Sequence, residues 1–105
     1  MVGHAEYREL GRLRASFNRR AYRLLRRSDF EGIAITDSLS VFGSDWAVPA
    51  ARLAIRAGAD LILFTSGPDA GRAIEALVPM ARRGLLDERV NRVLKLLRSY
   101  GVRRR

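Results

Sequence analysis

Two patterns of hydrophobic positions alternate along the chain. Short, continuous apolar runs occupy residues 33–35 and 61–64, and longer stretches between and after them repeat an apolar residue every three or four positions. Continuous runs of this length are typical of strands covered on both faces, whereas the longer period indicates amphipathic helices. The apolar start at residues 1–2 allows one further strand. The pattern therefore predicts an α/β fold of parallel strands alternating with helices.

Four helices are expected around these runs. Ser16 is the expected N-cap of the first, because apolar residues follow it at helical spacing. The second is expected at residues 46–57 with Asp45 as its cap, and Asp69 and Asp87 are the expected caps of the third and fourth. Two or three parallel strands leave unpaired edges and need cover on both faces. The pattern therefore predicts part of a larger repeating α/β fold.

Length and amino-acid composition indicate a single globular domain and argue against a disordered or membrane-spanning protein. At 105 residues the chain can form one domain at most, and 48% hydrophobic residues fit a globular protein better than a disordered one. No apolar run approaches the roughly 20 residues that a membrane span needs. No apolar segment near the start resembles a secretory signal, so a cytoplasmic location is expected. The chain has no cysteine and one histidine, His4, which excludes disulfides and a multi-histidine metal centre within one copy.

The formal charge of +9 allows two interpretations. Arginine supplies 19 of the 20 basic residues, and Lys95 is the single lysine. Arginines neutralise phosphates, so a nucleic-acid or anion-binding protein is one interpretation. The arginines are spread over several predicted helices, without interleaved aromatic residues for base stacking, and a solvated exterior explains the same count. Residues 103–105 are expected to form a frayed tail.

Asp37 is the first candidate for chemistry. It follows the apolar run at residues 33–35 after a single threonine. A carboxylate at the end of a buried parallel strand would lie at the carboxyl edge of the sheet, where α/β folds build their sites. The alternative is that Asp37 only caps the turn that follows.

Together these segments resemble the C-terminal part of the catalytic domain of glycoside hydrolase family 3, with the closer likeness to its bacterial β-N-acetylhexosaminidase branch. Residues 30–39, Phe-Glu-Gly-Ile-Ala-Ile-Thr-Asp-Ser-Leu, resemble the family's F-D-G-hydrophobic-S/T-D-D-L strand. Residues 1–5 look like a late strand ending in histidine. Residues 57–63 are similar to the last strand, which the family introduces with A-G-x-D, and residues 83–94 are similar to its closing helices.

The resemblance implies a fold and an activity. The family's (β/α)8 (TIM) barrel typically needs about 250 residues, so residues 1–105 would be a partial catalytic domain with the last two or three β-α units plus closing helices. Asp37 would be the nucleophile that attacks the anomeric carbon of a sugar. The implied substrates are saccharides with β-linked N-acetylglucosamine, and neither a metal nor an organic cofactor is implied.

Other polar and aromatic residues are weaker site candidates. His4 could line the sugar site or satisfy a buried hydrogen bond, and Ser38 stands where the family frequently has a second aspartate. The indole of Trp46 could stack on a sugar, or belong to the core. Asp60 precedes its strand on the opposite rim, so a structural hydrogen bond is expected of it.

The sequence departs from the family in the proton donor. In this branch the donor is a histidine paired with an aspartate on an upstream loop of the K-H-F-P-G-H-G type, and no such segment occurs here. The chain alone is therefore expected to be an inactive glycosidase fragment. Two other hypotheses are a small basic interaction protein and the C-terminal half of a split enzyme, whose first strands a separate chain supplies.

Overall fold

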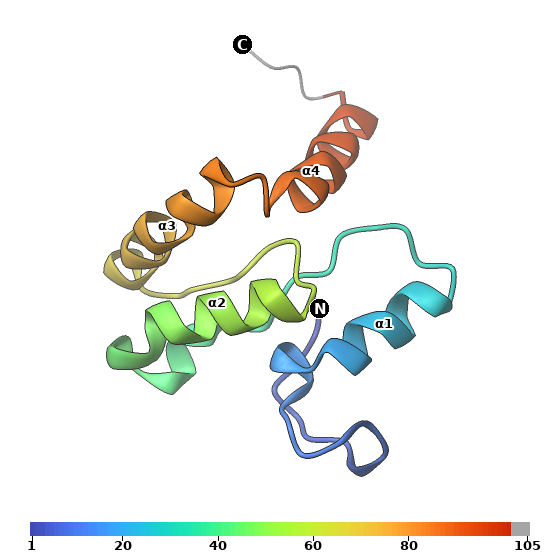
Figure 1. Cartoon of the computed structure of the whole chain (residues 1–105), viewed down its shortest axis with the longest axis horizontal. Helices are drawn as coiled ribbons and strands as arrows, with labels where there is room; N and C mark the ends of the chain where they lie inside the picture. The colour runs from blue at the N-terminus through green and yellow to red at the C-terminus, as the bar shows by residue number, and fades with distance from the viewer. Residues whose placement is uncertain (102–105) are drawn as a thin grey trace.

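Helices carry most of the structure, and the computed structural model describes residues 1–101 (Figure 1). The α-helices are α1 (Arg19–Arg27), α2 (Ala47–Ala57), α3 (Gly67–Arg82) and α4 (Asp87–Ser99). Short 3-10 helices precede α1 and α2: η1 (Arg8–Leu10), η2 (Ala15–Phe17), η3 (Leu39–Phe42) and η4 (Ser44–Trp46). Helix α2 packs against α3 and α1, and in Figure 1 α1 lies to its right, with α3 and α4 above it.

The predicted partial (β/α)8 barrel is wrong. The structure is 61% helical and only 6% strand, with no sheet in its described part. The expected strands meet only in isolated bridges, which are parallel between Val2 and Thr36 and between Ile35 and Leu61. The physical reason lies partly in Thr36, whose side-chain Oγ1 accepts the Leu63 N–H at 3.1 Å. A side chain thus takes the place of a ladder carbonyl, and regular pairing ends there.

The extended segments nevertheless run side by side. The Val2 N–H donates to the Ile35 carbonyl at 2.7 Å, and the Thr36 N–H donates to the Leu61 carbonyl at 3.1 Å. The segment at residues 33–37 therefore lies between the other two. As a result, the downstream ends of all three segments come together near Asp37.

Alanines let α2 approach these segments closely. Its buried face consists of Ala47, Ala50, Ala51, Ala54, Ile55 and Ala57. Ala50, Ala54 and Ala57 belong to the main core cluster with Tyr22, Ala34, Leu39 and Ala59. Small side chains bury little apolar area each, so this core depends on close packing more than on large side chains.

The four helices occur where they were expected, but none has the expected cap. Asn18, not Ser16, caps α1 by accepting the Arg20 N–H at 3.0 Å, and Ser66, not Asp69, caps α3. Asp45 lies in η4, and α2 begins without a side-chain cap. Asp87 is the first residue of α4 and not its cap. A 3-10 helix directly ahead of α1 or α2 moves the true cap a few residues from the expected one.

Asp60 joins two helices that are far apart in the sequence. Its fully buried carboxylate pairs with Arg26 of α1 at 2.6 Å and with Arg92 of α4 at 2.7 Å. The same carboxylate accepts the Ala34 N–H at 3.0 Å. Because every buried oxygen of Asp60 is paired, its role here is structural, as expected from the sequence.

Two further expectations concern the ends of the chain and the membrane. None of the helices within the described residues combines the length and the apolar character that a membrane span requires. The expected frayed tail at residues 103–105 lies outside the described residues.

Candidate functional site

Asp37 lies exposed at the end of the central extended segment. Its own N–H donates to the Val2 carbonyl at 2.9 Å, which fixes the backbone on one side. Its Oδ1 accepts the N–H of Ser38 at 2.8 Å. Oδ2 accepts no hydrogen bond from the described residues, so one oxygen of the carboxylate is held and the other is open to a ligand.

His4 holds the peptide that follows Asp37. Its Nε2 lies 2.8 Å from the Ser38 carbonyl oxygen, and its Nδ1 lies 2.7 Å from Ser16 Oγ. A carbonyl only accepts, so Nε2 must carry a proton, and in the neutral ring Nδ1 then accepts the hydroxyl proton of Ser16. The imidazole therefore bridges three chain segments, and its Nε2–H is already used. Of the two roles expected for His4, the structure shows the one in which its ring forms internal hydrogen bonds.

Ser38 connects the loop after Asp37 to the end of the third extended segment. Its side chain caps η3 by accepting the Ser40 N–H at 3.2 Å. Its Oγ also donates to Thr65 Oγ1 at a long 3.5 Å, and Ser40 Oγ accepts the Thr65 N–H at 3.0 Å. The hydroxyls of two serines thus fasten the loop, which restricts the position of Asp37.

Aromatic side chains pack on one side of His4. The ring of Phe42 lies 4.8 Å from the imidazole in an edge-on arrangement, and Phe17 lies 5.3 Å from Phe42. The guanidinium of Arg14 lies 5.3 Å from the centre of the Phe42 ring, at a distance suited to a cation–π contact. These contacts fix the imidazole plane against the loop.

Trp46 is not a core residue, because 61% of its surface is exposed. It lines a shallow apolar hollow of about 220 Å³ together with Phe17, Phe42 and Leu53. No hydrogen bond or ring contact within the described residues joins Trp46 to Asp37, His4 or Ser38. Phe42 connects the hollow to the candidate site, because it lines the hollow and its ring also contacts the imidazole of His4.

Sequence reasoning missed the part that Ser16 and Ser40 take in this site. Ser16 was interpreted as a helix cap, yet it is fully buried and hydrogen bonded to His4. No role was expected of Ser40, yet its Oγ accepts the Thr65 N–H. No local signal distinguishes either serine from an ordinary turn residue, because both partners lie far away in the sequence.

The buried side chain of Tyr22 supports the site through Ser16. Its hydroxyl donates to the Ser16 carbonyl at 2.8 Å, so the same residue that bonds His4 is held from two directions. Burial, and secondarily the negative charge of Asp60, raise the pKa of the Tyr22 phenol above its ordinary value. Tyr22 therefore stays protonated and acts as a fixed donor.

The described residues contain no group of three or more histidine, cysteine, aspartate or glutamate side chains that could hold a metal ion. The chemistry open to the site is that of one exposed carboxylate, positioned by its backbone and by its neighbours. Such a group can act as a nucleophile or as a general base. His4 cannot serve as a proton donor without breaking its bond to Ser38.

Comparison with known proteins places this arrangement within a known fold. The crystal structure of zinc-bound CbsA from Thermotoga neapolitana matches 98% of this chain with a TM-score of 0.75 and 22% sequence identity. A second crystal structure of CbsA matches 93% of the chain with a TM-score of 0.71, also at 22% identity. The chain shares its fold with part of CbsA.

This likeness shows the fold alone, and the chain spans about a quarter of the length of CbsA, 24% and 23% in the two structures. No family model matches the sequence. No curated protein matches it either. The resemblance to glycoside hydrolase family 3 therefore stays a prediction, carried by the residues around Asp37.

Proposed function

We propose that this chain is the nucleophile-bearing part of a retaining β-N-acetylhexosaminidase-like glycoside hydrolase. The observation that carries the proposal is Asp37, an exposed carboxylate at the end of the segment that resembles the family's nucleophile strand. The bond from the Ser38 N–H and the bond from the Asp37 N–H to Val2 support this role, because they hold the carboxylate in one place.

The proposed reaction follows the retaining mechanism. The Asp37 carboxylate attacks the anomeric carbon of a β-linked N-acetylglucosamine unit, and the glycosidic bond breaks as a glycosyl ester forms. The leaving oxygen takes a proton from an acid, and water then releases the sugar and frees the carboxylate. In this proposal the acid comes from outside the described residues, because the Nε2–H of His4 is bound to Ser38.

The neighbouring residues take supporting roles in the proposal. His4 and Ser38 position the loop beside the carboxylate. The exposed indole of Trp46 offers an apolar face on which a sugar ring can stack. A cytoplasmic location belongs to the same proposal, and cell fractionation measures it.

A glycosyl donor with a dinitrophenolate leaving group tests the role of Asp37. This group departs without protonation, so formation of the ester does not need the acid. We expect intact-mass analysis of the chain incubated with dinitrophenyl N-acetylglucosaminide to show one added glycosyl unit, mapped to Asp37. Asp37→Asn should remove the adduct, whereas Asp45→Asn, which changes another exposed aspartate, should keep it.

Three outcomes contradict the proposal: an adduct on another residue, an adduct that persists in Asp37→Asn, or no adduct after prolonged incubation. Each would mean that the carboxylate does not attack the anomeric carbon. The control variant separates the charge of the chain from the chemistry, because Asp45→Asn and Asp37→Asn change the net charge equally.

The basic interaction protein is a second candidate function, and one feature favours it. Five arginines line a hollow of about 410 Å³ between α1 and α4: Arg23, Arg26, Arg27, Arg89 and Arg92. Arg26 and Arg92 already pair with Asp60, and Arg89 donates to the backbone carbonyls of Ile55 and Ala59. Arg23 and Arg27 remain as the exposed cations for an anion. A gel-shift titration across salt concentrations tests this function, and no retardation at low salt would exclude it.

A further inference from the structure

Thr65 lies at the same end of the structure as the candidate nucleophile. It directly follows the third extended segment, as Asp37 directly follows the central one. The Leu39 N–H donates to the Leu63 carbonyl at 2.8 Å, which joins the backbone just after Asp37 to the backbone just before Thr65. Both Asp37 and Thr65 are exposed. A ligand that reaches the carboxylate of Asp37 therefore also lies close to Thr65.

The hydroxyl of Thr65 has a proton to donate. Ser38 Oγ accepts the Ser40 N–H at 3.2 Å and donates its own proton to Thr65 Oγ1 at 3.5 Å. Because Thr65 Oγ1 accepts this bond, its own proton is left for another acceptor. No acceptor for it occurs within residues 1–101, so the donor is open to a ligand.

The backbone of Thr65 is fixed as well. Its N–H donates to Ser40 Oγ at 3.0 Å, so Thr65 and the loop after Asp37 are joined by two side-chain bonds. A donor that is already held in place loses little conformational freedom when it binds a ligand. Such a group suits the recognition of a sugar hydroxyl, whose oxygen accepts a hydrogen bond.

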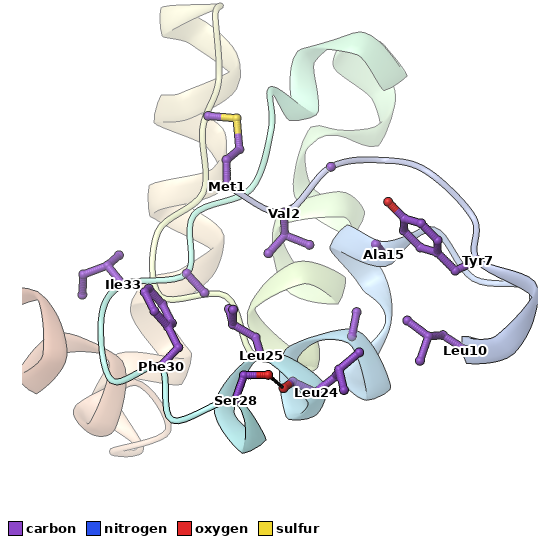
Figure 2. A pocket seen from close by; sticks show the side chains of 13 residues that line it. Met1, Val2, Tyr7, Leu10, Ala15, Leu24, Leu25, Ser28, Phe30 and Ile33 are labelled. Carbon is purple, nitrogen blue, oxygen red and sulfur yellow. Dashed lines mark hydrogen bonds between the residues drawn. The ribbon is translucent and has the colours of Figure 1, made fainter.

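The open groove between α1 and the N-terminal segment is apolar and differs from this polar edge. It has a volume of about 560 Å³, and Leu24 faces it together with Met1 and Phe30 (Figure 2). The Ser28 hydroxyl in its lining already donates to the Leu24 carbonyl at 3.0 Å, as Figure 2 shows. Exposed acids and exposed arginines both adjoin the lining, so charge selects no partner there. A sugar finds more hydrogen-bond partners beside Asp37 than in this groove.

We propose that Thr65 is a substrate-binding residue. Its Oγ1 donates a hydrogen bond to one hydroxyl of the N-acetylglucosamine unit that Asp37 attacks. This inference rests on the proposed glycosidase function, and it adds a contact that the resemblance to glycoside hydrolase family 3 does not assign. A site that bonds a substrate hydroxyl discriminates against an analogue that lacks it.

The rate at which the glycosyl adduct forms tests this contact. The chain and two variants are incubated with dinitrophenyl N-acetylglucosaminide, and intact-mass analysis follows the adduct with time. Thr65→Val replaces the hydroxyl by a methyl group, whereas Thr65→Ser keeps the hydroxyl. We expect Thr65→Val to slow adduct formation about three- to tenfold, as for the loss of one neutral hydrogen bond, and Thr65→Ser to restore most of the rate.

Deoxy donors separate a direct contact from a structural effect. Each of these dinitrophenyl donors lacks one hydroxyl of the sugar, and comparing two chains on the same donor cancels the reactivity of the donor itself. We expect Thr65→Val and the original chain to react equally fast with one deoxy donor, because the bonded hydroxyl is already absent. With the other deoxy donors, Thr65→Val should be slowed as it is with the complete sugar.

Ser44→Ala is the matched control, because it removes the hydroxyl of another exposed residue, which lies in η4. This variant should form the adduct at the original rate with every donor. Circular dichroism should show the same helix content in all the variants, so that a change in rate reports on the contact and not on the fold.

The remaining outcomes overturn the inference. An unchanged rate in Thr65→Val would mean that the hydroxyl binds no part of the sugar. An equal loss with every donor would mean that Thr65 acts through Ser38 and the loop, without touching the substrate. No adduct in the original chain would overturn the proposed function and this inference together, whereas an adduct on Asp37 that is insensitive to Thr65→Val would overturn the role of Thr65 alone.

Discussion

The Nε2 of His4 lies 2.8 Å from the carbonyl oxygen of Ser38, across 34 residues of sequence. The imidazole thereby ties the N-terminal segment to the loop that begins at Asp37. Ser16 completes the arrangement from the other ring nitrogen. The position of the candidate nucleophile therefore depends on a side chain that does not itself contact it.

His4→Ala should destabilise the fold. The substitution removes two hydrogen bonds and leaves the Ser16 hydroxyl and the Ser38 carbonyl without their partners, at a cost of about 1–2 kcal/mol. Urea unfolding followed by circular dichroism measures this loss. Arg12→Ala is the control, since Arg12 is exposed, and it should change the free energy of unfolding much less. An equal loss in both variants would contradict a bridging role for His4.

Asp37→Asn should leave the stability almost unchanged. The side chain is exposed, and the amide oxygen of asparagine can still accept the Ser38 N–H. We expect a change within about 0.5 kcal/mol in urea unfolding, as for most surface substitutions. A larger loss would make Asp37 a structural cap, which is the alternative left open by the sequence.

The chain alone should not hydrolyse an ordinary aryl N-acetylglucosaminide. Such a leaving group needs the missing acid, whose contribution is about 10²–10⁴-fold, and the remaining substrate contacts are missing as well. A fluorescence assay with a concentrated, pure chain measures this. Turnover that Asp37→Asn abolishes would show that the described residues suffice for catalysis.

Asp60→Asn should destabilise the fold strongly. The buried carboxylate pairs with both Arg26 and Arg92, so its loss leaves Arg26 without its counter-charge and Arg92 with only the exposed carboxylate of Glu88. Breaking a buried pair costs about 3–5 kcal/mol, and we expect about 3 kcal/mol because both arginines are partly exposed. Asp29→Asn is the matched control: Asp29 is exposed, and asparagine tolerates its φ of 60°.

Tyr22 should make the fold sensitive to alkaline pH. Its folded pKa is raised above the ordinary value of 10.0, so above pH 10 the unfolded chain loses the phenolic proton while the folded chain keeps it. The unfolded state then binds fewer protons, and stability falls by up to about 1.4 kcal/mol per pH unit until the folded pKa is reached. Thermal unfolding between pH 8 and pH 12 should show a weaker decline in Tyr22→Phe. Parallel declines would contradict this origin.

The helices were the most predictable part of the fold. The expected helix at residues 46–57 corresponds to α2 (Ala47–Ala57), and the fourth begins near Asp87 as expected. Their signal is local, because apolar residues three and four positions apart share one face of a helix. The caps were less predictable, since a 3-10 helix before a helix shifts its first residue.

The predicted sheet was the main error, and Thr36 shows one reason. An apolar run indicates that a segment is extended and buried against other apolar groups. It does not predict how many backbone hydrogen bonds the neighbouring segments will form with it. Here each neighbour supplies isolated bridges, and the Thr36 side chain takes up the Leu63 N–H. The two runs are adjacent and parallel, yet they form no ladder within the described residues.

The sequence by itself determined where the helices lie and that Asp37 follows an apolar run, because these depend on neighbours within a few positions. The tertiary structure decided that His4 bonds Ser38 and Ser16, that Trp46 is exposed, and that Leu24 faces an open groove. The two partners of His4, for example, lie 12 and 34 residues away from it in the sequence. Contacts over such distances arise only when the whole chain packs, so no local pattern encodes them.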